Sequence, residues 1–552
     1  MPNRHFTATA VALAAGIALV PGLADAAGTA PTSATTATHP TDTSLLLKDM
    51  SSQFKTFTSP AHALIRHTAP ATTRGADSDP SLELNLTAQQ SSAYSVALST
   101  SLTSDTNLKV TADFNWGDGT TDSKALTSPG FVDAPHTYAK LGTYTITVTL
   151  TDAQGDSATN WVTFKTAGSD YTPYGPTRLL DTRNGTGAPV AKVRPGESAK
   201  VQVGGNGGIP ADVTAVVLNV TVTDTTAAGY ITAYDDGDIR PDTSNLNYTA
   251  HSTVANQVIV QPGADGAVDL YNGGSGSVDL IADIAGYFTT NPSSGYTPLA
   301  PQRLVDTRNG TGTAKQQLAA GSSLVAQVAG ADSNLPAAGI TAVALNITAT
   351  GGRSAGYLTA YPDGTTTPVA SNVNFTTGQT VANAVITPVG TDGRIRIYNG
   401  GAQPVSVIVD VVGYYSPTSK NAYTPFTPDR FIDTRSTTSK TPPLAGNSYT
   451  YVPISPTLHM YTTWVLNATV TDTTSTGYLT VDPDPNTWTQ YQNHTAKKPT
   501  KPTASTLNWL PSQTTENLVQ ADDGASGIID FWNTSTSKTD LIVDLFGTYD
   551  NS

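Results

Sequence analysis

The sequence RLLDTRNGTG occupies residues 178–187 of this 552-residue chain, and it is the first of three copies. It returns as RLVDTRNGTG at 303–312 and, less well preserved, as RFIDTRSTTS at 430–439. Each copy follows a YTP sequence, and the three YTP tyrosines, at positions 171, 296 and 423, are 125 and 127 residues apart. A period this long exceeds the repeats of solenoids and single propeller blades, so we expect each copy to be a complete domain.

Further landmarks recur in the same order within each copy. LNVT, LNIT or LNAT is followed by GYIT or GYLT, then by LYNGG, IYNGG or FWNTS, and each copy closes with IADIAGYF, IVDVVGYY or IVDLFGTY. The runs between them alternate apolar and polar residues and are separated by Gly, Asp and Asn turns, which is strand periodicity. About seven short strands per copy predict an antiparallel sandwich. The expected fold class is all-β, a multidomain string of β-sandwiches with repeats at 171–290, 296–416 and 423–550.

A different β-rich segment, residues 81–167, precedes the repeats and contains ADFNWGDGT and HTYAKLGTYTITVTLTDAQG. GDG is typical of a turn between strands, and Trp116 and Tyr144 have the size to fill the space between two sheets. This segment resembles the PKD domain, a small immunoglobulin-like β-sandwich common in secreted and surface proteins. The matching residues are Trp116, Gly117, Asp118, Gly119, His136, Tyr138, Gly142, Tyr144 and Val148. The resemblance implies that His136 is a hydrogen-bonded structural residue.

The three repeats resemble tandem β-rich repeats of secreted actinobacterial proteins, and this resemblance implies an exported, modular bacterial protein. The first 26 residues agree with it, because a polar start, an apolar stretch and the small-x-small sequence ADA are typical of a signal peptide. The apolar stretch is shorter than the ~20 residues that span a bilayer. Residues 27–80 are rich in Thr, Ala, Ser and Pro and are predicted to be a linker. We expect a secreted, extracellular protein without membrane insertion.

Composition excludes several kinds of chemistry. The net charge of −14 and the pI of about 4.8 argue against nucleic acid as a partner, because phosphate binding needs clustered Lys and Arg. The chain has no Cys, and its eight His residues have no metal-ligand spacing, so we expect no cofactor. Two Asp-rich turns leave structural calcium as an alternative. Their residues are Asp235, Asp236 and Asp238 in the first turn, and Asp482, Asp484 and Asn486 in the second.

The recurring Asp and Arg residues are predicted to form structural ion pairs. Each copy ends in an apolar strand that carries one Asp, and a buried carboxylate needs a partner such as the planar guanidinium of Arg. The predicted pairs are Arg183 with Asp283, Arg308 with Asp410, and Arg435 with Asp544. The alternative is a pair of acid/base carboxylates of the glycosidase type, although a nearby Arg lowers the pKa of an Asp and removes its acid function. The recurring Asn219, Asn346 and Asn467 are expected to bond backbone groups.

The third copy contains 13 extra residues between its GYLT and LNW sequences. Trp488 and Tyr491 lie in this insertion, and a loop aromatic residue can stack on a sugar ring. These two residues are the candidate ligand contacts, and the alternative is that Trp488 holds its own loop on the sandwich. We therefore expect a non-catalytic binding or structural protein, with an extracellular polysaccharide or a cell-surface component as its partner. The alternatives are a glycoside or ester hydrolase whose site the repeats form, and an envelope spacer without a ligand.

Overall fold

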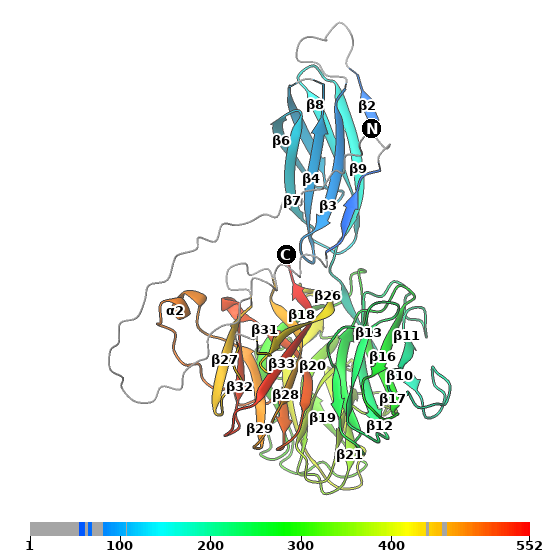
Figure 1. Ribbon diagram of the computed structural model, residues 1–552, viewed down its shortest axis with the longest axis vertical. Helices are drawn as coiled ribbons and strands as arrows, with labels where there is room; N and C mark the ends of the chain where they lie inside the picture. Colours follow the sequence, from blue (N-terminus) through cyan, green and yellow to red (C-terminus); the bar gives the residue numbers. More distant parts are fainter. Residues whose placement is uncertain (1–53, 61–64, 69–80, 106, 438–440, 455–460) are drawn as a thin grey trace. The chain divides into compact units, whose positions relative to one another are not determined.

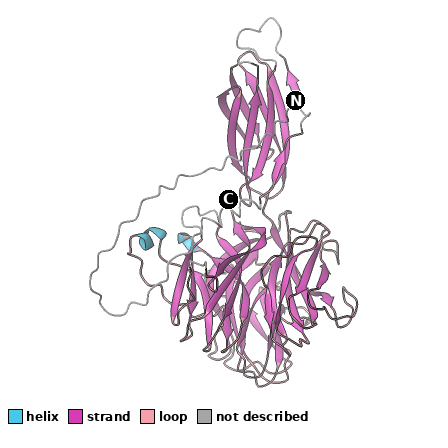
Figure 2. Ribbon diagram, in the orientation of Figure 1, coloured by secondary structure: helices cyan, strands magenta, loops and turns pink. Residues whose placement is uncertain are grey.

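The computed structural model describes residues 54–60, 65–68, 81–105, 107–437, 441–454 and 461–552. Strands dominate these ranges, in which the helical elements are α2 (Trp488–Gln492) and a 3-10 turn at Gly524–Ser526 (Figures 1 and 2). The strands form eight antiparallel sheets, which confirms the predicted all-β class. No helix in the described ranges is long and apolar enough to cross a membrane. The predicted signal peptide, residues 1–26, lies outside the described residues.

The first sandwich consists of two antiparallel sheets packed around a common core. One sheet holds β3 (Glu83–Gln90), β4 (Ser95–Thr103) and β7 (Gly130–Thr137), and the other holds β9 (Ser157–Lys165), β8 (Thr143–Asp152), β5 (Lys109–Asn115) and β6 (Thr121–Thr127). Two short strands, β1 (Thr56–Thr58) and β2 (Ile65–His67), pair with β3 and β9. These strands belong to the segment predicted as a linker, so part of that segment joins the sandwich.

Trp116 and His136 occupy structural positions in this sandwich. Trp116 is fully buried, and the ring of His136 stacks on it with a centroid distance of 4.6 Å. The Nε2 atom of His136 lies 2.9 Å from a carboxylate oxygen of Asp118 in the GDG turn. The structural role implied for His136 is confirmed, because its nitrogen and its ring face both contact neighbouring residues.

Each repeat contains an inner sheet, which begins with the YTP strand, and an outer sheet. The two strand orders in repeat 1 are β10-β17-β12-β15 and β11-β16-β13-β14, and the other repeats have the corresponding orders. The strands of repeat 1 are β10 (Asp170–Asp181), β11 (Ser198–Gln202), β12 (Ala215–Thr223), β13 (Gly229–Asp235), β14 (Leu246–Tyr248), β15 (Val254–Val260), β16 (Ala267–Asn272) and β17 (Asp279–Thr289). Those of repeat 2 are β18 (Gly295–Asp306), β19 (Ser323–Gln327), β20 (Ala342–Thr350), β21 (Gly356–Pro362), β22 (Val373–Phe375), β23 (Val381–Pro388), β24 (Arg394–Asn399) and β25 (Ser406–Ser416). Those of repeat 3 are β26 (Ala422–Asp433), β27 (Ser448–Pro453), β28 (Thr463–Thr471), β29 (Gly477–Pro483), β30 (Leu507–Trp509), β31 (Thr515–Asp522), β32 (Ile528–Asn533) and β33 (Asp540–Asp550).

Strands of the inner sheets are buried on both faces. In β12, Val216 and Leu218 point into the core of repeat 1, whereas Ala215 and Val217 point into a second core. This second core, which we call the shared core, contains side chains from all three repeats. Burial on both faces explains why the inner strands read as continuous apolar runs rather than as alternating ones. Each repeat therefore has its own core and also contributes to a core that it cannot form alone.

Six aromatic side chains of the shared core contact one another in a closed cycle. Each repeat supplies the tyrosine of its YTP sequence and the last aromatic residue of its final strand. The centroid distances around the cycle are 5.3 Å for Tyr171–Phe288, 4.8 Å for Phe288–Tyr423, 5.0 Å for Tyr423–Tyr549, 4.6 Å for Tyr549–Tyr296, 5.0 Å for Tyr296–Tyr415 and 4.3 Å for Tyr415–Tyr171. Every second contact joins two different repeats, so the three copies close on one another.

A glycine beneath each YTP tyrosine allows this packing. The hydroxyl of Tyr171 donates a hydrogen bond of 2.8 Å to the carbonyl oxygen of Ala285, and its ring lies directly over Gly286. A Cβ atom at Gly286 would collide with that ring, and the same holds for the equivalent glycines of the other two repeats, Gly413 and Gly547. The recurrence of Gly in the closing sequences IADIAGYF, IVDVVGYY and IVDLFGTY thus follows from the recurrence of Tyr in YTP.

The recurring LNxT asparagines form a second cyclic set of contacts. Their Nδ2 atoms donate to backbone carbonyl oxygens of the next repeat: Asn219 to Ser371, Asn346 to Ser505, and Asn467 to Ser244. Their Oδ1 atoms accept hydrogen bonds from a second asparagine of that same next repeat, Asn383, Asn517 and Asn256 respectively. The expectation that these amides bond backbone groups is confirmed, and the structure adds that the bonds run between repeats.

Replacing one ring of the aromatic cycle should destabilise all three repeats together. Tyr415 touches Tyr171 and Tyr296, and its hydroxyl lies 2.7 Å from that of Tyr549. We expect Tyr415→Ala to lower the free energy of unfolding by about 3–5 kcal/mol, because it leaves a cavity where three repeats meet. Amide hydrogen exchange should accelerate in the inner sheets of all three.

The control variant is Tyr398→Ala, in the outer sheet of the same repeat. This tyrosine is half-buried and lies outside the shared core. Its loss should affect exchange in repeat 2 alone. If the effect of Tyr415→Ala were also confined to repeat 2, the repeats would fold independently and the shared core would not couple them.

Candidate functional site

An ion-pair network joins the first and last strands of each repeat. In repeat 1, Nε and Nη2 of Arg178 donate to the two carboxylate oxygens of Asp283 at 2.9 and 3.1 Å, and Nη1 donates to Asp181 at 3.0 Å. Arg183 then binds the same Asp181 through Nε and Nη2, at 2.9 and 2.8 Å. In repeat 2 the network consists of Arg303, Asp306, Arg308 and Asp410, and in repeat 3 of Arg430, Asp433, Arg435 and Asp544.

The structure corrects the predicted pairing of Arg183, Arg308 and Arg435 with Asp283, Asp410 and Asp544. Each terminal Asp does have an Arg partner, but the partner is the arginine that opens the motif: Arg178, Arg303 or Arg430. The reason is register, since Arg178 lies opposite Asp283 in the pairing of β10 with β17. Arg183 follows the end of β10, and both its side chain and its backbone N–H turn back to Asp181.

Neither carboxylate of the network is free for acid/base catalysis. Burial raises the pKa of Asp410, and the charge of Arg303 opposes that effect. The hydrogen bonds from Arg308 lower the pKa of Asp306 to about 2. Both carboxylates are almost fully buried and bound to guanidinium groups, whereas a glycosidase pair must flank a substrate bond. The geometry therefore matches a structural network.

Trp488 and Tyr491 lie on helix α2 rather than in a loop. The helix begins at a capping box, in which Thr487 and Gln490 exchange hydrogen bonds, and the sequence TWTQ already carries this signal. Both aromatic side chains are half-buried against a cluster of the outer sheet that includes Tyr451 and Trp532. The ring of Tyr491 stacks on Tyr451 at 3.7 Å, and its hydroxyl donates to Asp484.

The two Asp-rich turns are bound by protein donors. Asp236 of the first turn accepts a hydrogen bond of 2.7 Å from Lys200. In the second turn, Asn486 donates to Asp484 at 2.8 Å, in addition to the bond from Tyr491. Burial, with Asp238 nearby, raises the pKa of Asp235 to about 6. Among the described residues, no group of three or more His, Asp or Glu side chains is placed to hold a metal ion.

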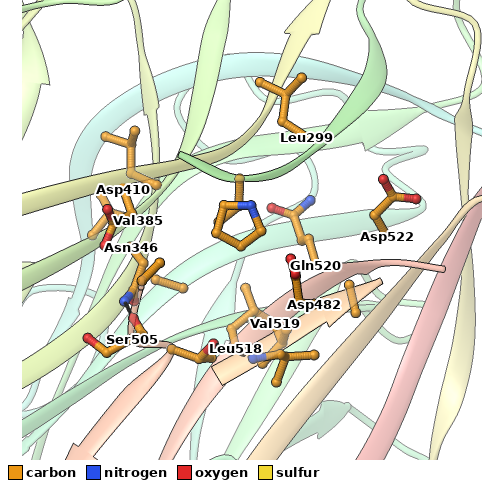
Figure 3. Close-up of a pocket in the computed structure, with 18 of the residues that line it drawn as sticks. Leu299, Asn346, Val385, Asp410, Asp482, Ser505, Leu518, Val519, Gln520 and Asp522 are labelled. Carbon is orange, nitrogen blue, oxygen red and sulfur yellow. Dashed lines mark hydrogen bonds between the residues drawn. The ribbon is translucent and has the colours of Figure 1, made fainter. Parts of the chain in front are cut away.

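A pocket lies between repeats 2 and 3 (Figure 3). We call it the junction pocket. Its walls are mainly apolar, and Leu299, Pro301, Val385, Val412, Leu518 and Val519 contribute to them. Figure 3 shows Asp482, Gln520 and Asp522 on one side of the pocket, and Asn346, Asp410 and Ser505 on the other.

Sequence reasoning missed the pocket because its two walls belong to different repeats. A signal was nevertheless present in the comparison of the copies. Leu299 stands where the other repeats have Tyr174 and Phe426, and Asp482 stands where they have Tyr234 and Tyr361. Two positions that hold aromatic residues in the other copies thus hold smaller side chains in the lining of this pocket.

The corrected pairing predicts different costs for the two arginines of one motif. We expect Arg303→Ala to lower the free energy of unfolding by about 3–5 kcal/mol, because it leaves Asp410 buried and unpaired. Arg308→Ala should cost about 1 kcal/mol, because the Arg308 side chain is half-exposed and Asp306 keeps Arg303. Urea unfolding measures both. Adding Asp410→Asn should recover part of the stability lost in Arg303→Ala and none of the stability lost in Arg308→Ala. Recovery in the Arg308→Ala background alone would instead support the pairing of Arg308 with Asp410.

The Asp306–Arg308 pair should make stability depend on acid pH. An unfolded Asp titrates near pH 4, whereas the folded pKa of Asp306 is about 2, so the pair stabilises the fold above about pH 4. This contribution is lost as the pH falls towards 2. The difference in unfolding free energy between the wild type and Arg308→Ala should therefore be constant above pH 4 and shrink below it. A difference that is the same at pH 2 and pH 7 would contradict this account.

Comparison with known proteins identifies one part of the chain. The family model described as the PKD domain matches residues 83–165. No curated protein matches the chain. Among solved structures, the native conformation of E. coli alpha-2-macroglobulin, determined by cryo-EM, is similar at 10% identity with a TM-score of 0.13, over 86% of this chain and 33% of that one. The chain thus spans about a third of that protein's length. The resemblance of residues 83–165 to the PKD domain is confirmed.

Proposed function

We propose that this protein is a non-catalytic, extracellular binding or structural protein that attaches to a polysaccharide or to a cell-surface component. The observation that carries the proposal is the combination of a PKD domain with three repeats whose recurring charged residues bind one another. A module built in this way supplies rigid surfaces rather than reactive groups. We further propose that residues 1–26 are a signal peptide through which the protein is secreted. The proposed domains are residues 81–167, 171–290, 296–416 and 423–550.

The aromatic residues around α2 support carbohydrate as the ligand. Trp488 and Tyr491 lie beside Trp532, and Lys498 lies 5.9 Å from the centre of the Trp532 ring. Flat apolar rings can stack on the face of a sugar, and neighbouring polar side chains can bind its hydroxyls. Because one face of Tyr491 already stacks on Tyr451, we assign the main stacking contact to Trp488.

The alternatives make different predictions for the same experiment. A hydrolase formed by the repeats would need an open carboxylate pair, and the recurring carboxylates described above are bound to arginines. Such an enzyme would release soluble sugar or acid from its substrate. A spacer without a ligand would show neither release nor retention on any polymer.

The test is retention of the purified chain on insoluble cell-wall and plant polysaccharides. We expect retention without release of reducing sugar, and we expect Trp488→Ala to weaken retention by about ten-fold, because stacking on an aromatic ring is worth about 1–1.5 kcal/mol. Tyr398→Ala is the matched control, since it removes a half-buried aromatic residue from another repeat. Unchanged retention of Trp488→Ala would leave α2 as a structural element, and release of soluble sugar would favour the hydrolase.

A further inference from the structure

The junction pocket carries two acidic side chains within mainly apolar walls. Asp482 lies on β29, and Asp522 is the last residue of β31, so both belong to repeat 3 and face the wall formed by repeat 2. Figure 3 shows them on the same side of the pocket as Gln520. Burial raises the pKa of both carboxyl groups, that of Asp482 to about 6, and the charge of Asp522 adds to the effect on Asp482.

Within the described part of the chain, neither carboxylate has a cationic partner. The ion pairs of the structure include no contact of Asp482 or Asp522 with Lys, Arg or His. Asp522 accepts one backbone hydrogen bond, of 2.8 Å, from Gly524. Asp410, across the pocket, is already bound by Arg303. Two like charges near each other in an apolar cavity cost free energy unless a cation reaches them.

The other two junctions lack this combination of residues. Where repeat 3 has Asp482, repeats 1 and 2 have Tyr234 and Tyr361, whose hydroxyls lie 3.4 and 3.1 Å from Ser198 and Ser323. Where repeat 3 has Asp522, repeats 1 and 2 have Gln261 and Pro388. Closure of the junction therefore does not require the two carboxylates, since the other two junctions close without them.

We propose that the junction pocket binds a small organic cation, an alkyl- or cycloalkylammonium group. The ammonium would lie between Asp482 and Asp522 and donate hydrogen bonds to both, while its hydrocarbon part contacts Leu299, Val385 and Leu518. The pocket differs from a sugar site, because no aromatic ring lines it. It also differs from a divalent-cation site. Such a site needs more oxygen ligands than two carboxylates supply, and no group of three or more His, Asp or Glu side chains among the described residues could hold a metal ion.

The experiment is a calorimetric titration of the full chain with n-butylammonium chloride at constant ionic strength. We expect saturable binding with one site per chain, and none with n-butanol or sodium butyrate, which lack the positive charge. Asp482→Asn and Asp522→Asn should each weaken binding by about ten-fold or more, because each removes one charged hydrogen-bond acceptor. The control Asp392→Asn, at an exposed turn of repeat 2, should bind like the wild type.

A further variant tests the pocket with a residue that the other two repeats already carry at the same position. Asp482→Tyr introduces the residue that the other two copies carry, so it should fold and should abolish binding by filling the cavity. Circular dichroism and the melting temperature check folding of each variant. Absence of saturable binding with both n-butylammonium and cyclohexylammonium would overturn the proposal, as would equal binding of n-butanol or unchanged binding in both Asn variants. Polysaccharide retention should be unaffected by these variants, so failure here is distinguishable from failure of the proposed function.

Discussion

The closed cycle of six aromatic rings is the constraint on which the arrangement of the repeats depends. Two rings from each copy meet in one core, and each final strand must therefore carry a Gly where the tyrosine of its YTP sequence crosses it. The inner strands face this core on one side and their own sandwich on the other, which makes them apolar throughout. The LNxT asparagines then satisfy backbone groups at the borders between copies, where a buried unpaired carbonyl would be costly.

Much of the fold could be predicted from the sequence, because its local signals are strong. Alternation of apolar and polar residues indicated strands, the long period indicated whole domains, and WGDGT with HTY indicated the PKD domain. The closure of the three repeats could not be predicted in the same way. Tyr171 and Tyr415 are 244 residues apart, and nothing local to either residue indicates that their rings lie 4.3 Å apart.

The candidate sites show where sequence reasoning stops. A buried Asp that needs an Arg was inferred correctly, but the choice between Arg178 and Arg183 depended on strand register and on the end of β10, which spacing alone does not settle. The junction pocket is harder still to predict from the sequence, because residues of two different repeats form it. The sequence does point to the pocket when the three copies are compared, because Leu299 and Asp482 stand at positions where the other two copies have aromatic residues.

Internal repetition offers a way to separate structural from functional residues in this chain. Positions that are equal in the three copies, such as the arginine that opens each motif, bind other recurring residues and are fully used by the fold. Departures from the repeat are where a copy is free to acquire a property of its own. Helix α2 with Trp488 and the pair Asp482 and Asp522 are such departures, and all belong to repeat 3. Repeat 3 thus differs most from the common pattern, while its inner sheet packs into the same shared core as those of the other two copies.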